Sequence, residues 1–167
     1  MTTPTEWMKD EYNDLVSKGF DWKPPVITGA SSARCIIDGS EKIMLCANNY
    51  LNLSTHPKVR KAAIDAVKSH GAGSGSVRPI AGNMDIHNQL EETIARFKKR
   101  EAALYYQTGF AVNSGLIPQL AGKNDAIISD QLNHGSIIDG VRLSGVKKEN
   151  RTIYLHNDMG SLEDQLK

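Results

Sequence analysis

Polar residues that follow apolar runs are the main candidates for chemistry in this chain. His134 lies in such a segment, between Asn133 and Gly135. An imidazole at this place could stack on an aromatic ring or exchange a proton near neutral pH. The alternative is that His134 caps the next helix by bonding its backbone. The local residues leave both interpretations open.

A second candidate is the turn at Thr108 and Gly109, between an apolar run at 102–106 and a helical pattern at 110–120. A helix N-terminus that follows a strand presents free N–H groups suited to a phosphate. Gly109 allows close approach of the backbone, and the Thr108 hydroxyl can add a donor. The alternative, which this segment alone favours, is an ordinary turn with Thr108 as the N-cap. Neither of the two commonest glycine-rich nucleotide motifs is present.

The third candidate is the stretch HGAGSGSVRPIAG at residues 70–82. Its glycines let the backbone pack closely against another group. Arg78 could hold a phosphate or a carboxylate through two parallel hydrogen bonds. The alternative is a structural loop in which Arg78 pairs with a neighbouring acidic residue.

Hydrophobic periodicity predicts the elements that position these segments. From residue 102 onward, strand-like runs alternate with helix-like runs. This alternation favours an α/β fold with a mostly parallel sheet and helices on both faces. The expected strands are 102–106, 126–129 and 151–155, and the expected helices are 110–120, 136–143 and 162 onward.

The residues before 102 predict an arm, a hairpin and two helices. Met8, Tyr12, Leu15 and Val16 form one apolar face of a helix over 5–18. Strands at 34–37 and 42–47 flank the turn Asp38-Gly39-Ser40. Further helices are expected from residue 57 to Gly71 and over 86–97, the latter with Asp85 in its first turn.

Composition excludes several classes of protein. The 20 basic and 19 acidic side chains give a net charge of +1, which argues against a nucleic-acid binder. No apolar run approaches the ~18 residues of a membrane span, and the N-terminus lacks a secretory signal. Cys35 and Cys46 are interpreted as buried thiols in a reducing cytosol rather than a disulfide. The histidines show no metal-ligand spacing.

Several blocks taken in order resemble one family, the α-oxoamine synthases. The blocks span residues 42–167 and read ANNYLNLSTHP, HGAGSGSVRPIAGNMDIHNQLE, ALYYQTGFAVNSGLI, DAIISDQLNHGSIIDGVRLS and HNDMGSLE. Members of this family are fold-type I pyridoxal-phosphate (PLP) enzymes that condense an amino acid with an acyl-CoA. CANNYL and IISDQLNHGSIIDGVRLS resemble the glycine C-acetyltransferase (2-amino-3-ketobutyrate CoA ligase) branch, with the 8-amino-7-oxononanoate synthases next.

The resemblance implies roles for individual residues. His134 matches the catalytic histidine that stacks on the cofactor pyridine. Gly109 and Phe110, beside Thr108, match the helix start that holds the cofactor phosphate. Asn48 matches an asparagine that helps to bind the amino-acid carboxylate, although the residues alone suggest a polar turn. Weaker substrate-site candidates, near the active-site mouth and the dimer interface, are Ser76 and Arg78. Departures from the family pattern occur at Asn52 and Gln107-Thr108-Gly109.

The resemblance also implies a reaction and an organisation. An amino acid loses its α-proton while the pyridine ring delocalises the charge, and its α-carbon attacks the acyl-CoA thioester with release of CoA. Glycine and acetyl-CoA are the expected substrates, and a cytoplasmic homodimer is the expected assembly. Residues 1–45 would form the arm and hairpin, and 46–167 the first part of the PLP-binding large domain.

The residues of a complete PLP enzyme are not all recognisable. No lysine lies in a family-like motif, and Lys98, Lys99, Lys147 and Lys148 lie in charged pairs typical of a surface. The aspartate expected at the pyridine nitrogen is also not found. We therefore expect residues 1–167 to be an incomplete catalyst. The alternatives are a non-catalytic cofactor-binding or interaction fragment that pairs with a full-length relative, and an unrelated Rossmann-like phosphate-binding protein.

Overall fold

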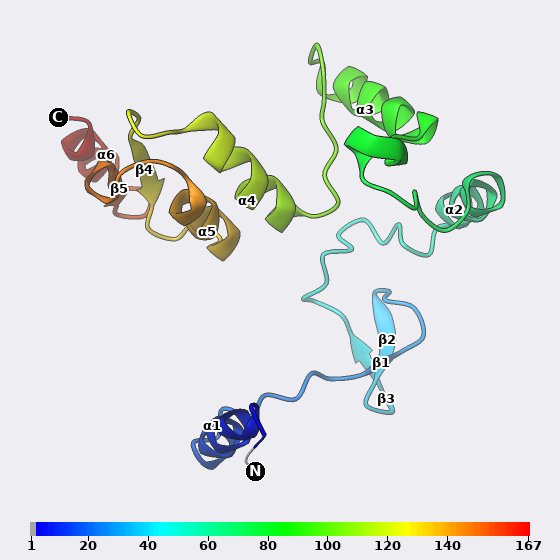
Figure 1. Ribbon diagram of the computed structural model, residues 1–167. Coiled ribbons are helices and arrows are strands. Elements are labelled where there is room, and N and C mark those ends of the chain that lie inside the picture. The colour runs from blue at the N-terminus through cyan, green and yellow to red at the C-terminus, as the bar shows by residue number, and fades with distance from the viewer. Residues whose placement is uncertain (1–2) are drawn as a thin grey trace. The chain divides into compact units, whose positions relative to one another are not determined.

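The computed structural model describes residues 3–167, which divide into two compact units. The first unit ends at Gly75, and the second runs from Ser76 to Lys167 (Figure 1). The sequence predicts a different boundary, between residues 45 and 46, which separates the arm and hairpin from the first part of a larger domain. That boundary stays a prediction.

The first unit contains an isolated helix and a three-stranded antiparallel sheet. Helix α1 (Glu6–Ser17) confirms the helix predicted over 5–18 and buries none of its residues. The sheet consists of β1 (Ile27–Thr28), β2 (Arg34–Ile37) and β3 (Ser40–Ile43) in that order. Strand β1 was not predicted, because two residues carry no recognisable alternation.

The hairpin between β2 and β3 turns at Asp38 and Gly39. Both residues have positive φ, 48° and 78°, as a two-residue type I′ turn requires. Ile37 therefore pairs with Ser40, and the strand predicted at 42–47 in fact begins and ends earlier. The expectation of two buried thiols is correct for Cys35 and wrong for Cys46, which is exposed; both are free.

Helix α2 (Pro57–His70) completes the first unit and confirms the helix predicted from residue 57 to Gly71. Nδ1 of His56 caps it by accepting from the backbone N–H of Lys58 at 3.2 Å. Pro57 suits the first helical position because its missing N–H would have no partner there. The helix ends at Gly71, whose φ of 79° favours glycine.

The second unit begins with the turn η1 (Arg78–Gly82) and helix α3 (Asp85–Lys98). It continues through α4 (Gly109–Leu120), β4 (Ile127–Asp130) and α5 (Gly135–Leu143). The short turn η2 (Lys148–Asn150), β5 (Arg151–Tyr154) and α6 (Met159–Leu166) follow. Strands β4 and β5 are parallel, with Ile127 opposite Arg151 and Asp130 opposite Tyr154. The predicted alternation of helices and parallel strands is therefore confirmed from α4 onward.

The strand predicted at 102–106 is wrong. No strand among residues 3–167 pairs with this segment, and the backbone N–H of Tyr105 instead donates to Oε1 of Glu91 at 2.9 Å. An apolar run indicates burial, but strand formation also requires a neighbouring strand, which local sequence does not specify.

Helices α4 and α5 pack closely at Gly140. A Cβ atom at this position would overlap the carbonyl oxygen of Asn113 and crowd Ile117. Helix α6 begins at Met159, three residues before the predicted start, because the Asp158 carboxylate caps it by accepting from Ser161 N at 2.9 Å.

The apolar core of the described residues is small. Only Cys35, Ala95 and Val146 are buried hydrophobic residues there, and of these only Val146 is fully buried. On β5 and just after it, Ile153 is 67% exposed and Leu155 is 56% exposed, so this apolar surface is largely uncovered. Within residues 3–167, no helix combines the length and the apolar character needed to cross a membrane.

Candidate active site

The starts of α4 and α5 lie side by side in the second unit. The Asn113 side-chain amide, in α4, donates to the hydroxyl of Ser136, in the first turn of α5, at 2.9 Å. The close packing at Gly140 holds the two helices together one turn further along. Both helices follow polar turns, so two of the predicted site segments come together here.

The start of α4 offers unpaired backbone donors. Oγ1 of Thr108 accepts from the N–H of Ala111 at 3.0 Å, so the N-cap interpretation of Thr108 is correct. Within residues 3–167, the N–H groups of Gly109 and Phe110 have no hydrogen-bond partner. A Cβ atom at Gly109 would meet nothing within 4 Å. Two free donors at a positive helix end, beside open space, suit an anion.

The start of α5 fixes His134 through one ring nitrogen. Nδ1 accepts from the backbone N–H of Ser136 at 3.1 Å and lies 2.7 Å from the Ser136 hydroxyl. Because Nδ1 accepts, the proton of the neutral ring is assigned to Nε2. The capping interpretation of His134 is therefore correct. It leaves the ring exposed, so capping does not compete with stacking on a ligand.

The turn that leads to His134 is held by the last residue of β4. Oδ1 of Asp130 accepts from the N–H of Leu132 at 2.8 Å. The Asn133 side chain donates to the hydroxyl of Ser129 at 2.9 Å. These bonds set the direction in which the chain enters α5 and so the place of the imidazole.

Asp130 also joins the carboxyl ends of β4 and β5. Nδ1 of His156 lies 2.9 Å from Oδ1 of Asp130, and the N–H of Asn157 donates to Oδ2 at 3.2 Å. The contact with His156, followed by the Leu132 amide, lowers the pKa of Asp130 to about 2. The sequence analysis missed this pair. The signal was available, because both residues follow apolar runs and parallel strands end at the same edge.

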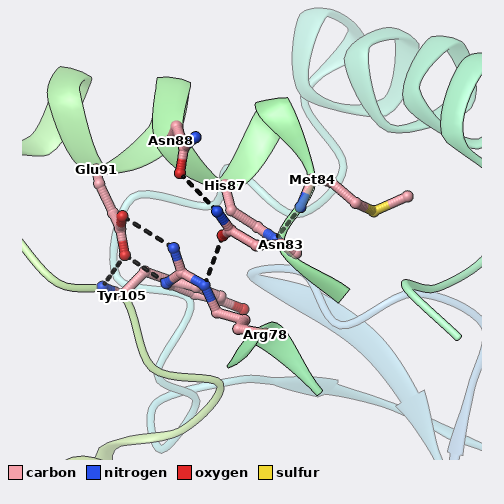
Figure 2. Close-up of polar contacts among 7 residues, drawn as sticks. All are labelled: Arg78, Asn83, Met84, His87, Asn88, Glu91 and Tyr105. Carbon is pink, nitrogen blue, oxygen red and sulfur yellow. Dashed lines mark hydrogen bonds and ion pairs between the residues drawn. The ribbon is translucent and has the colours of Figure 1, made fainter. Parts of the chain in front are cut away.

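The arginine of the glycine- and serine-rich segment, Arg78, forms hydrogen bonds with other residues of the same unit (Figure 2). Arg78 donates from Nη1 to Oε1 of Glu91 at 2.5 Å and from Nη2 to Oε2 at 3.0 Å. Its Nε donates to Oδ1 of Asn83 at 2.9 Å. The structure thus favours the structural interpretation of this loop, while direct substrate contacts by Ser76 and Arg78 stay predictions.

Asn48 lies in the first unit and is exposed. Its neighbour Asn49 is used structurally, because Nδ2 of Asn49 donates to the carbonyl of Ser31 at 3.1 Å and to the hydroxyl of Ser54 at 2.8 Å. The predicted cofactor residues come together in the second unit, whereas the role of Asn48 toward a substrate stays a prediction.

This chain is similar in sequence to proteins of one known family. The sequence pattern of the family described as aminotransferase class I and II matches residues 40–167. An 8-amino-7-oxononanoate synthase from Treponema denticola is 47% identical, over 97% of this chain and 40% of that protein. One from Alkaliphilus metalliredigens is 46% identical over the same shares.

A solved structure shares the fold. It is a serine palmitoyltransferase from S. paucimobilis with a bound PLP–myriocin aldimine, and it matches with a TM-score of 0.84 and 27% identity. The match covers 97% of this chain and 40% of that one. The chain therefore spans about 40% of the length of the curated relatives that it matches.

Proposed function

Because this chain belongs to the class I and II aminotransferase family, we propose that the protein containing it is a PLP-dependent α-oxoamine synthase. The expected α/β fold, the N-terminal part of the fold-type I fold, is confirmed by the serine palmitoyltransferase structure. One observation carries the functional proposal. The free N–H groups at the start of α4 lie on a helix that is hydrogen-bonded to the helix capped by His134.

The residues at these two helix starts fit the two recognisable parts of PLP. The N–H groups of Gly109 and Phe110 would bind the phosphate, with the Thr108 hydroxyl as a further donor. The His134 imidazole would stack on the pyridine ring. When bound, PLP supplies a ring that delocalises the electron pair left by α-proton removal from an amino acid.

The proposed reaction joins the α-carbon of an amino acid to the acyl carbon of a CoA thioester and releases CoA. Asn48 would bind the amino-acid carboxylate. Ser76 and Arg78 remain candidates for the substrate entrance. We also propose that the protein is a cytoplasmic homodimer. The lysine that binds PLP covalently is proposed to lie outside residues 1–167.

The substrate is proposed from the names of the relatives. The glycine C-acetyltransferase branch expected from the sequence is not supported, because the relatives described above are 8-amino-7-oxononanoate synthases. That product carries its amino group on C8, beside the ketone at C7. Joining these carbons requires an amino acid with a methyl side chain and a seven-carbon acyl donor with a terminal carboxylate. Because the product has nine carbons, the carboxyl group of the amino acid must also leave as CO2, besides the release of CoA. We favour this pair over glycine and acetyl-CoA.

A turnover assay on the native protein tests the proposal. The protein is isolated from its source, loaded with PLP, and supplied with either substrate pair while free CoA thiol is measured. We expect thiol release that requires both substrates and is faster with alanine and the dicarboxylic acyl-CoA. Faster release with glycine and acetyl-CoA would favour the other branch. Bound PLP without thiol release would indicate the non-catalytic alternative, and no PLP binding would overturn the proposal.

A further inference from the structure

Glu91 of α3 is the centre of a polar network outside the helix starts described above (Figure 2). Both of its carboxylate oxygens accept from Arg78, at 2.5 and 3.0 Å. Oε1 also accepts from the backbone N–H of Tyr105 at 2.9 Å. The Glu91 side chain is only 16% exposed, so water competes weakly for these bonds.

Helix α3 holds Tyr105 by its ring as well as by its backbone. His87 lies one turn before Glu91, and its ring stacks on that of Tyr105 with centroids 6.3 Å apart and planes at 18°. Nδ1 of His87 is itself fixed by the N–H of Met84 at 3.1 Å (Figure 2). Two side chains on one face of α3 therefore restrain a single residue of the next segment.

The restrained residue leads directly to the helix start that offers free N–H groups. Tyr105 precedes Thr108 by three positions, and the ring of Tyr106 lies against Gly115 of α4, 3.8 Å from the place of an added Cβ. Among the described residues, the bond from Tyr105 to Glu91 is the only hydrogen bond made by the backbone of 102–107. Glu91 is thus the main polar restraint on the approach to α4.

Arg78 restrains the Glu91 carboxylate that binds the backbone of Tyr105. Besides Glu91, it binds Asn83, which also donates to Oδ1 of Asn88 at 3.3 Å. The turn that carries Arg78 is tight, because a Cβ atom at Gly82 would overlap the carbonyl group of Ser76. The compact backbone at this turn therefore orients the Arg78 guanidinium, and the guanidinium orients the Glu91 carboxylate.

We propose that Glu91 and Arg78 are positioning residues for the phosphate subsite at Gly109 and Phe110, acting through the backbone of Tyr105. This inference rests on the proposed function, since it assumes that the start of α4 holds the phosphate of PLP. The Glu91 carboxylate keeps the entry to α4 in place, and Arg78 keeps that carboxylate in place. The pKa of Glu91 is lowered to about 2 by Arg78 and the Tyr105 amide, so the group is ionised at neutral pH.

Comparison of PLP with pyridoxal separates positioning from general stabilisation. Pyridoxal has the same ring but no phosphate, so only PLP depends on the start of α4. Loss of a hydrogen bond that holds a charged ligand weakens binding by about tenfold. Dissociation constants for both ligands are measured by spectroscopic titration of the native apoprotein and of Glu91→Ala, Glu91→Gln and Arg78→Lys. Glu92→Ala is the control, because Glu92 is 70% exposed and pairs with Arg96 at 3.8 Å.

We expect Glu91→Ala to weaken PLP binding about tenfold while pyridoxal binding changes less than about twofold. Glu91→Gln should restore part of the loss, because its amide oxygen still accepts from Tyr105. Glu92→Ala should change neither constant. The inference would be overturned if Glu91→Gln and Arg78→Lys weakened the binding of PLP and of pyridoxal equally, or if neither variant weakened PLP binding. These two variants also provide the test if Glu91→Ala does not fold. Failure of the unmodified protein to prefer PLP over pyridoxal would instead contradict the proposed function.

Discussion

Asn113 and Ser136 are joined by a hydrogen bond of 2.9 Å that connects the second turn of α4 with the first turn of α5. The same Ser136 hydroxyl lies 2.7 Å from Nδ1 of His134. Ser136 is almost fully buried, so its hydroxyl depends on these two neighbours for hydrogen bonds. One serine thus couples the proposed phosphate subsite to the proposed ring-stacking histidine.

The first prediction concerns that coupling. Asn113→Ala and Ser136→Ala, combined in a double-mutant cycle, should give a coupling free energy of about 1 kcal/mol in the stability of the native protein. Urea unfolding of the two single variants and the double variant measures it. A cycle in which the two single effects simply add would contradict the hydrogen bond between the two helix starts.

The second prediction separates the two roles of His134. His134→Ala should lose both the helix cap and the ring, so stability falls by about 1 kcal/mol and PLP affinity falls by up to about tenfold. His134→Asn retains a capping side chain without an aromatic ring. It should therefore keep most of the stability and still lose PLP affinity. Unchanged affinity and turnover in His134→Asn would eliminate the stacking role.

The third prediction concerns the packing of α4 against α5. Gly140→Ala places a Cβ atom onto the carbonyl oxygen of Asn113, so the helices must separate, at a cost of about 1–3 kcal/mol in stability. Gly135→Ala is the matched control, because an added Cβ there meets nothing within 4 Å. Thermal unfolding of both variants checks the prediction. A Gly140→Ala protein as stable as Gly135→Ala would refute the close packing.

The fourth prediction is a dependence of stability on pH. The folded-state pKa of Asp130 is lowered from 3.8 to about 2, mainly by His156. A depressed carboxyl pKa stabilises the fold above the unfolded value, and this stabilisation is lost as pH falls through about 2. Between about pH 4 and 2, the melting temperature of Asp130→Asn should therefore fall less steeply than that of the unmodified protein.

Glu91 titrates in the same range, since its pKa is also lowered to about 2, so Asp130→Asn removes only part of the slope. Asp125→Asn provides a comparison at another carboxylate of the same unit. Parallel melting curves for the unmodified protein and Asp130→Asn across this range would show that the Asp130–His156 contact does not stabilise the fold.

Local rules explain what could be predicted from the sequence. The turn chemistry of Thr108, His134 and Gly71 marks helix ends, and α2, α4 and α5 were placed within a residue or two. The parallel arrangement followed from the alternation of strands and helices. In these cases each residue determines the conformation of its own neighbours along the chain.

Contacts between distant positions explain what could not be predicted. Arg78 and Glu91 are 13 positions apart, so no local pattern pairs them. Asp130 and His156 are 26 positions apart, and only the rule that parallel strands end at the same edge of a sheet could have paired them. The segment 102–106 has the composition of a strand, but its described polar partner is a side chain of α3. Two roles considered as alternatives for His134 also proved compatible, because capping uses one ring nitrogen and leaves the ring exposed.

Whether the start of α4 holds the cofactor phosphate is tested by the PLP dissociation constant of Gly109→Pro, compared with that of Gly109→Ala, in the native protein. Proline is tolerated at the first helical position but removes the N–H, and the extended Thr108 backbone is compatible with a following proline. Alanine keeps the N–H, and its Cβ meets nothing within 4 Å. If the start of α4 holds the cofactor phosphate, Gly109→Pro binds PLP about tenfold more weakly than Gly109→Ala. Equal affinity in the two variants would contradict the claim.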